Sequence, residues 1–247
     1  MKALTLRPRT LLVVALWIVV VHALLVFALL KTNFVPLARK TLGIDPPEER
    51  SVAQYQTMLG WFERDRRVPK NAVVLLGDSL LQDLHSAHLG REVHSFALGG
   101  TTASVLLEVV SGLSCLERAK VVVLGVGAND LKYRSPAQIL AAYSVLLSAF
   151  PPELDLVVVP VLPVDERAPD VIARPYLSNR RLGELDHLLS ACALARSRTR
   201  RVDVRELLAP DGSLRSDLHS GDGWHLSDEG DALLGRAIAR ELDALSR

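Results

Sequence analysis

The longest apolar run of the chain lies close to its amino terminus. Residues 10–30 contain no Asp, Glu, Lys or Arg, and they follow a short leader that holds Lys2, Arg7 and Arg9. About 20 such residues span a bilayer as one helix, whereas the apolar core of a cleaved secretory signal is shorter, roughly 7–15 residues. Leu and Phe crowd the end of the run, where a cleavage site needs small residues. We therefore expect residues 1–30 to be a basic leader and an uncleaved transmembrane signal anchor.

The charges that flank the apolar run say little about its orientation. Lys31, Arg39 and Lys40 follow the run, so basic residues flank it on both sides and the positive-inside rule hardly favours either orientation. The short basic leader ahead of a first apolar helix resembles a signal anchor and favours an amino terminus inside the cell. This orientation places the rest of the chain outside the cytoplasm, in the periplasm or the extracellular space.

Residues 31–70 read as a spacer followed by a juxtamembrane helix. Prolines punctuate the first half of the segment, and Pro69 ends it. Between them, apolar residues recur at helical spacing: Val52, Tyr55, Met58, Leu59 and Phe62. Such a stripe either lies on a membrane surface or docks on a neighbouring domain, and docking is the commoner arrangement.

From Asn71 onward, short apolar runs alternate with helical patterns. The runs predict strands at residues 73–76, 93–98, 120–126, 154–162 and 201–204, and the periodic segments predict helices at 101–116, 135–150, 178–196 and 227–245. Continuously apolar strands between helices indicate a parallel sheet that is covered on both faces. We expect residues 71–247 to form one α/β domain, a three-layer α/β/α sandwich with about five strands and right-handed crossovers.

Small and polar residues follow the strand ends, where parallel sheets place their sites. Gly77-Asp78-Ser79 ends the first strand, Gly99-Gly100 the second and Gly127-Ala128-Asn129-Asp130 the third, while Asp222-Gly223-Trp224-His225 precedes the last helix. Ser79 therefore stands where a strand turns into a helix, near free helix N–H groups. That position suits a nucleophile whose attack creates an oxyanion. The alternative is that Ser79 only caps the helix.

The other blocks also have two interpretations each. Gly99-Gly100 is a tight turn, or a place where a backbone N–H approaches a ligand closely. Asn129 is a loop cap, or an amide that donates to an oxyanion. Asp222 and His225 are an ordinary loop pair, or a carboxylate that orients an imidazole acting as general base. The segment 163–177 is expected to border the pocket, and its Arg167 and Arg174 either meet an anionic substrate or are solvated.

Taken together and in this order, the blocks resemble those of the GDSL, or SGNH, hydrolase family of serine esterases and lipases. The resemblance runs from about Asn71 to the carboxyl terminus. It implies a flavodoxin-like sandwich and ester hydrolysis through a serine acyl-enzyme. It also implies roles for individual residues: Ser79 as nucleophile, His225 as general base, Asp222 as its orienting carboxylate, and the Ser79 N–H, the Gly100 N–H and the Asn129 side chain as the oxyanion hole.

This sequence departs from the family pattern at one block. The family often carries an asparagine shortly before the glycine of its second block, whereas residues 95–98 here are Ser-Phe-Ala-Leu. Either Gly99 or Gly100 is then the backbone donor. The elbow motif GxSxG of the α/β-hydrolases is absent from the sequence, which argues against that other serine-esterase fold.

Composition and charge exclude several other classes of function. The formal net charge is +1 and only 5% of residues are aromatic, so neither a basic field nor a stacking surface points to nucleic acid. No CxxC or HExxH motif suggests a metal, and we expect neither a metal nor another cofactor. Cys115 and Cys192 are expected as free thiols, although one disulfide between them is conceivable.

The sequence thus favours a membrane-anchored serine esterase or lipase that acts on a small-molecule, lipid or glycan ester. An O-acyltransferase with the same catalytic residues is the nearest alternative, because pocket shape and water exclusion choose the acceptor. A non-catalytic binding module on the same fold is the third, although it would have no reason to keep all four blocks. No nucleic-acid partner is expected.

Overall fold

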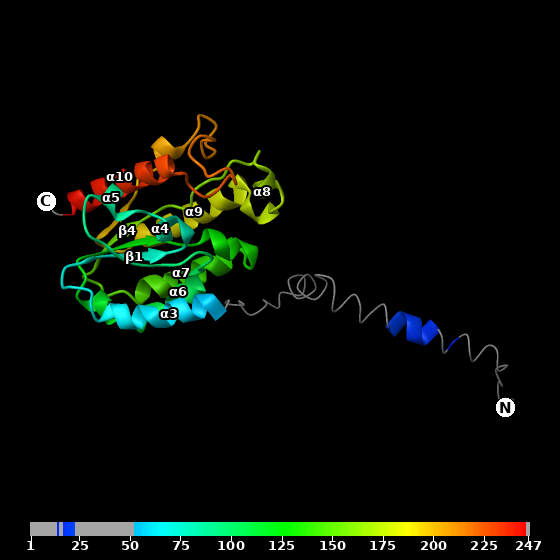
Figure 1. Ribbon diagram of the computed structural model, residues 1–247, viewed down its shortest axis with the longest axis horizontal. Helices are drawn as coiled ribbons and strands as arrows, with labels where there is room; N and C mark the ends of the chain where they lie inside the picture. Colours follow the sequence, from blue (N-terminus) through cyan, green and yellow to red (C-terminus); the bar gives the residue numbers. More distant parts are fainter. Residues whose placement is uncertain (1–13, 15–16, 23–51, 246–247) are drawn as a thin grey trace, which may run out of the picture. The chain divides into compact units, whose positions relative to one another are not determined.

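The computed structural model describes residues 14, 17–22 and 52–245 (Figure 1). The chain divides into two compact units, Met1–Glu49 and Arg50–Arg247. In the first unit, the described residues 14 and 17–22 are helical, and the rest of the expected anchor and spacer lies outside the described residues. Within the described part of the chain, no helix combines the length and the apolarity that crossing a bilayer requires.

A parallel sheet of five strands forms the centre of the second unit, as the alternating pattern predicts. In spatial order β2-β1-β3-β4-β5, these are β2 (His94–Ala97), β1 (Val73–Gly77), β3 (Val121–Gly125), β4 (Asp155–Val158) and β5 (Thr199–Arg201). Every neighbouring pair is parallel. This order is the flavodoxin-like one, in which the chain leaves β1 first to one side and then to the other. The carboxyl ends of β1 and β3 therefore lie side by side at the switch point.

Helices cover both faces of the sheet (Figure 1). One face carries α3 (Val52–Asp65), α6 (Ala103–Val110), α7 (Pro136–Ser148) and α9 (Asn179–Leu194), and the other carries α4 (Ser79–Gln82), α5 (Ser86–Leu89) and α10 (Asp228–Ala244). Within β1, Val74 and Leu76 pack into the first layer and Leu75 packs into the second. Both faces of a strand are thus buried, which is why the strands are apolar without alternation.

Short helical turns fill the connections. They are α8 (Pro169–Ile172) and the 3₁₀ turns η1 (Ser114–Glu117), η2 (Ala128–Lys132), η3 (Pro175–Leu177) and η4 (Arg205–Leu207). The sequence predicts a helix over residues 101–116, but α6 ends at Val110 and η1 begins four residues later, at Ser114. Gly112 lies between them, and a side chain there would meet the ring of Phe62 at 2.5 Å. Glycine at this position lets the Phe62 ring of α3 approach the turn closely.

The helix expected near residue 52 is present as α3, and it docks on the sheet layer. Its buried apolar side chains are Met58 and Trp61, and the Trp61 ring meets the Phe96 ring edge-on with 5.9 Å between the ring centres. Leu59 and Phe62, which the periodicity assigns to the same stripe, are 48% and 38% exposed. The buried face is therefore rotated relative to the expected one, because Trp61 rather than Leu59 enters the core.

The close approach of β1 and β3 leads to the first prediction. A side chain at Gly77 would collide with the carbonyl oxygen of Gly125, its partner on β3, whereas nothing lies within 4 Å of a side chain at Gly183 in α9. Gly77→Ala should lower the free energy of unfolding by about 3 kcal/mol, since a strand cannot yield without breaking its ladder. Gly183→Ala, the same change inside a helix, should raise it by about 0.5–1 kcal/mol. Urea unfolding measures both, and equal midpoints for the two variants would contradict this packing.

Candidate active site

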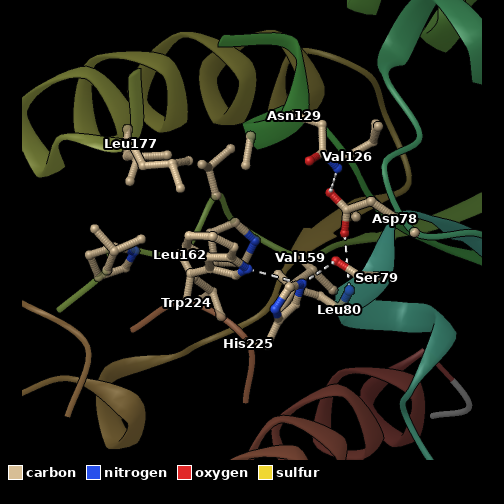
Figure 2. A pocket seen from close by; sticks show the side chains of 18 of the residues that line it. Asp78, Ser79, Leu80, Val126, Asn129, Val159, Leu162, Leu177, Trp224 and His225 are labelled. Atoms are coloured by element: carbon tan, nitrogen blue, oxygen red, sulfur yellow. Dashed lines mark hydrogen bonds between the residues drawn. The ribbon is translucent and has the colours of Figure 1, made fainter. Parts of the chain in front are cut away.

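The residues expected to do chemistry meet at the carboxyl edge of the sheet, around a cavity of about 270 Å³ (Figure 2). Ser79 follows β1, Gly100 follows β2, Asn129 lies in η2 after β3, and His225 lies in the loop before α10. Asp222 contacts His225 from behind. The structure thus brings all five predicted residues to one place.

Asp78, rather than Ser79, caps the helix that follows β1. The Asp78 Oδ1 accepts the Leu80 N–H at 3.1 Å, and Ser79 is the first residue of α4. The interpretation of Ser79 as a helix cap is therefore wrong. Its hydroxyl oxygen instead lies 3.1 Å from Nε2 of His225, and among the described residues nothing accepts its backbone N–H. The Ser79 hydroxyl is thus held against the imidazole, with the N–H of the same residue left as a donor beside it.

His225 is oriented by Asp222. The distance from Nδ1 of His225 to Oδ2 of Asp222 is 2.5 Å, and Oδ1 of Asp222 accepts the backbone N–H groups of Trp224 and His225, each at 2.9 Å. Burial raises the pKa of Asp222, but these hydrogen bonds outweigh it and leave the pKa below its ordinary value. The ionised carboxylate thus accepts a hydrogen bond from the Nδ1–H group and leaves the Nε2 lone pair facing Ser79.

The two N–H groups of the double glycine differ in whether the protein supplies an acceptor for them. The Gly99 N–H donates to Oε1 of Gln82 at 2.5 Å, and the Gly99 carbonyl accepts the side-chain amide of Gln54 at 2.9 Å. Gly100 has φ +78°, lines the cavity, and has no acceptor for its N–H among the described residues. Gly100 is therefore the glycine that can serve a ligand. Gln54 and Gln82 were not predicted, since no local pattern marks a side chain that bonds a distant turn.

The two residues of the Asn-Asp pair after β3 face different surroundings, Asp130 the start of α6 and Asn129 the cavity. Both carboxylate oxygens of Asp130 accept the Ala103 N–H, at 3.2 and 3.0 Å, so Asp130 holds the start of α6. Asn129 lines the cavity, and its Nδ2 lies 3.3 Å from the Thr101 carbonyl oxygen and 3.4 Å from Oδ2 of Asp78. The capping interpretation thus fits Asp130, whereas the Asn129 amide is held by two long hydrogen bonds.

Asp78 is a buried carboxyl that links the two halves of the site (Figure 2). It is only 4% exposed, and burial raises its pKa to about 7 despite the hydrogen bond from Leu80. Burial thus favours the protonated form of this carboxyl. The sequence gives no signal of this, because Asp before a helix is ordinarily an exposed cap.

The segment expected to border the pocket does so. Pro163, Val164, Tyr176 and Leu177 line the cavity. Its arginines point to other partners: Arg167 pairs with Asp165 at 2.8 Å, and the guanidinium of Arg174 lies 4.3 Å from the centre of the Trp224 ring. Neither arginine lines the cavity, so nothing here favours an anionic substrate. Cys115 and Cys192 are free thiols.

The cavity offers a ligand apolar walls and a few polar groups at one end. Across the described ranges, no cluster of three His, Cys, Asp or Glu side chains is arranged to hold a metal ion. The polar end contains a serine hydroxyl, an imidazole with its carboxylate, and up to three N–H donors. This constellation can attack a carbonyl carbon and stabilise the oxyanion that results.

Comparison with known proteins agrees with this arrangement. Residues 45–233 match the model of the GDSL-like Lipase/Acylhydrolase family. A Streptococcus pneumoniae protein shares the fold with a TM-score of 0.69 and 20% identity, over 76% of this chain and 92% of its own. A GDSL-like lipase of Bacteroides thetaiotaomicron has a TM-score of 0.62 and 14% identity, over 76% of this chain and 97% of its own. The carbohydrate acetylesterase Est24 of Sinorhizobium meliloti has a TM-score of 0.52 and 21% identity, over 71% of this chain and 100% of its own.

No curated protein matches the chain. At these identities the solved structures establish the fold, which confirms the expected α/β sandwich with its parallel sheet of five strands. The family match covers most of the chain, and it confirms the resemblance read from the four blocks. The chain therefore belongs to the GDSL-like Lipase/Acylhydrolase family of ester hydrolases.

Proposed function

We propose that the chain hydrolyses carboxylic esters through an acyl-enzyme on Ser79. One observation carries this proposal: the hydrogen-bonded series Ser79–His225–Asp222, with distances of 3.1 and 2.5 Å, ends in a cavity that a substrate can enter. The order of these groups matches the roles that acyl transfer requires, namely nucleophile, base and orienting carboxylate.

In this mechanism, Nε2 of His225 takes the Ser79 proton as the hydroxyl oxygen attacks the ester carbonyl. The imidazolium that forms is stabilised by the ionised Asp222 and then protonates the departing alcohol. Water, activated by the same imidazole, attacks the acyl-enzyme and regenerates Ser79. Both tetrahedral intermediates carry a negative oxygen that needs donors.

The proposed oxyanion hole consists of the Ser79 N–H, the Gly100 N–H and the Asn129 amide. The two backbone donors have no acceptor among the described residues, so they are ready for an oxyanion. Asn129 has to exchange one of its contacts at 3.3 and 3.4 Å. That exchange favours the oxyanion, because hydrogen bonds to a charged oxygen are shorter and stronger than such long neutral ones.

The acyl group is proposed to occupy the apolar part of the cavity. Its walls include Val159, Val161 and Leu162 after β4, together with Leu177 and Leu182. Burying an apolar chain there stabilises the complex by about 0.8 kcal/mol per methylene, whereas an acetyl group would leave most of these walls without contact. Esters with longer acyl chains are therefore the preferred substrates, and nitrophenyl esters of increasing acyl length test this.

Ser79→Ala should abolish ester hydrolysis and leave the fold intact, because losing a small hydroxyl creates little cavity. A serine-directed phosphonate should add to the wild-type chain at Ser79, and mass spectrometry of the labelled peptide locates it. Ser148→Ala, the same change at an exposed position in α7, is the control and should keep full activity. Undiminished turnover by pure Ser79→Ala would sink the serine mechanism.

Asn129→Ala should lower kcat by about 10²–10³ with little change in KM, since its amide acts only once charge develops on the substrate oxygen. Asn129→Asp keeps the shape but replaces the donor by an acceptor, and it should be impaired at least as much. Steady-state kinetics on one ester measures both variants. If Asn129→Ala raised KM alone, Asn129 would be a binding residue and the oxyanion assignment would be wrong.

We also propose that residues 10–30 anchor the chain in a membrane, with residues 71–247 as the catalytic domain outside the cytoplasm. The support is the uncharged apolar run itself. The full chain should stay with membranes through an alkaline carbonate wash, and a chain that begins at Asp45 should not. A carboxyl-terminal reporter that requires an oxidising compartment should be active. Release of the full chain by carbonate would contradict the anchor, and a reporter active only in the cytoplasm would reverse the orientation.

A further inference from the structure

Two donors meet at one acceptor in the candidate active site. Nε2 of His225 lies 3.1 Å from the hydroxyl oxygen of Ser79 and 3.0 Å from Nε1 of Trp224 (Figure 2). Because Nδ1 donates to Asp222, Nε2 has a single lone pair. An indole N–H can only donate. Trp224 therefore competes with the Ser79 hydroxyl for the lone pair that takes up the proton in catalysis.

The indole is held in this position from its other side. The guanidinium of Arg174 lies over the Trp224 ring, 4.3 Å from its centre, a cation–π contact. Arg174 is fixed in turn, since it donates to the Asp170 carbonyl oxygen at 2.7 Å. The ring thus lies between the segment 163–177 and the imidazole.

The backbone before Trp224 is also fixed. The Gly223 carbonyl accepts the Asp165 N–H at 2.8 Å, and a side chain at Gly223, where φ is +91°, would meet Cβ of Ala168 at 2.5 Å. The turn can therefore press against residues 165–168 only because residue 223 is glycine. This packing sets the position from which the indole reaches His225.

We infer that Trp224 is a positioning residue that donates its indole N–H to the neutral His225 and so holds the base in its deprotonated form. The inference rests on the proposed role of His225. The charged groups around the imidazole are Asp222 at Nδ1, the buried Asp78 across Ser79, and Arg174 beyond the indole. Trp224 differs from these groups because it is neutral and donates directly to Nε2.

The contact has opposite effects at the two ends of the pH range. A donor on the lone pair opposes protonation from solvent, so the base stays competent at lower pH. The same contact is lost whenever His225 takes the proton from Ser79, because Nε2–H is then a donor itself. Trp224 therefore stabilises the resting state more than the transition state, and it slows the chemical step where the base is already deprotonated.

Trp224→Phe keeps a ring under Arg174 but removes the N–H. The acidic limb of its kcat/KM profile should lie about 0.5–1 pH unit above that of the wild type, the size of one neutral hydrogen bond. Above the limb, its activity should exceed that of the wild type by about 2- to 5-fold, so the two profiles cross. Trp61→Phe, which removes an indole N–H that faces no imidazole, is the control and should keep the shape of the profile.

A second measurement follows the indole N–H resonances of the folded, full-length wild-type chain. The sequence has three tryptophans, so ¹⁵N-indole labelling gives three resonances, which Trp17→Phe and Trp61→Phe assign by elimination. The Trp224 N–H resonance should move across the acidic limb, and His225→Gln should abolish this movement even though Asp78 still titrates. This readout needs no esterase activity, so it also tests the contact if the proposed reaction is wrong. A pH-independent Trp224 resonance, or a Trp224→Phe profile lower at every pH, overturns the inference.

Discussion

The buried carboxyl of Asp78 is the constraint on which the site depends. Its N–H donates to the Gly125 carbonyl at 3.0 Å and joins the end of β1 to the end of β3. One of its carboxylate oxygens caps α4, which makes Ser79 the first residue of that helix, and the other contacts the Asn129 amide. The proposed nucleophile and the proposed side-chain donor are thus held by the same carboxyl group. A change there would move both at once.

Two carboxyls near the reacting atoms are kept in different charge states by their surroundings. Burial raises the pKa of Asp78 to about 7, whereas hydrogen bonds lower the pKa of Asp222 despite its partial burial. A negative charge at Asp222 stabilises the imidazolium. In the proposed mechanism, a negative charge at Asp78 would oppose an oxyanion held by Asn129, so a proton on Asp78 would favour the intermediate. Separate environments for two similar groups are how one site keeps one carboxyl ionised while favouring the protonated form of another.

Much of the fold was predictable because its signals are local. Strands buried on both faces are continuously apolar, and strand ends put Ser79, Gly100 and Asn129 at one edge whatever the loops do. The errors arise where distant packing decides. Helix α6 ends before Gly112, where the Phe62 ring of α3 packs closely, and the amides of Gln54 and Gln82 reach the double glycine from other helices. The residues next to Phe62, Gln54 or Gln82 in the sequence cannot show which way its ring or amide points, because distant residues decide it.

The apolar run at residues 154–162 contributes to both the sheet and the wall of the cavity. A strand was expected over residues 154–162, but β4 ends at Val158. The Val159 N–H still reaches the Leu124 carbonyl at 2.8 Å, and Pro160 then has no N–H with which to continue the ladder. The chain leaves the sheet while its residues stay apolar, so Val161 and Leu162 line the cavity, and Leu162 also belongs to the buried core. Hydrophobicity along this run therefore reflects packing within the sheet first and the lining of the cavity afterwards.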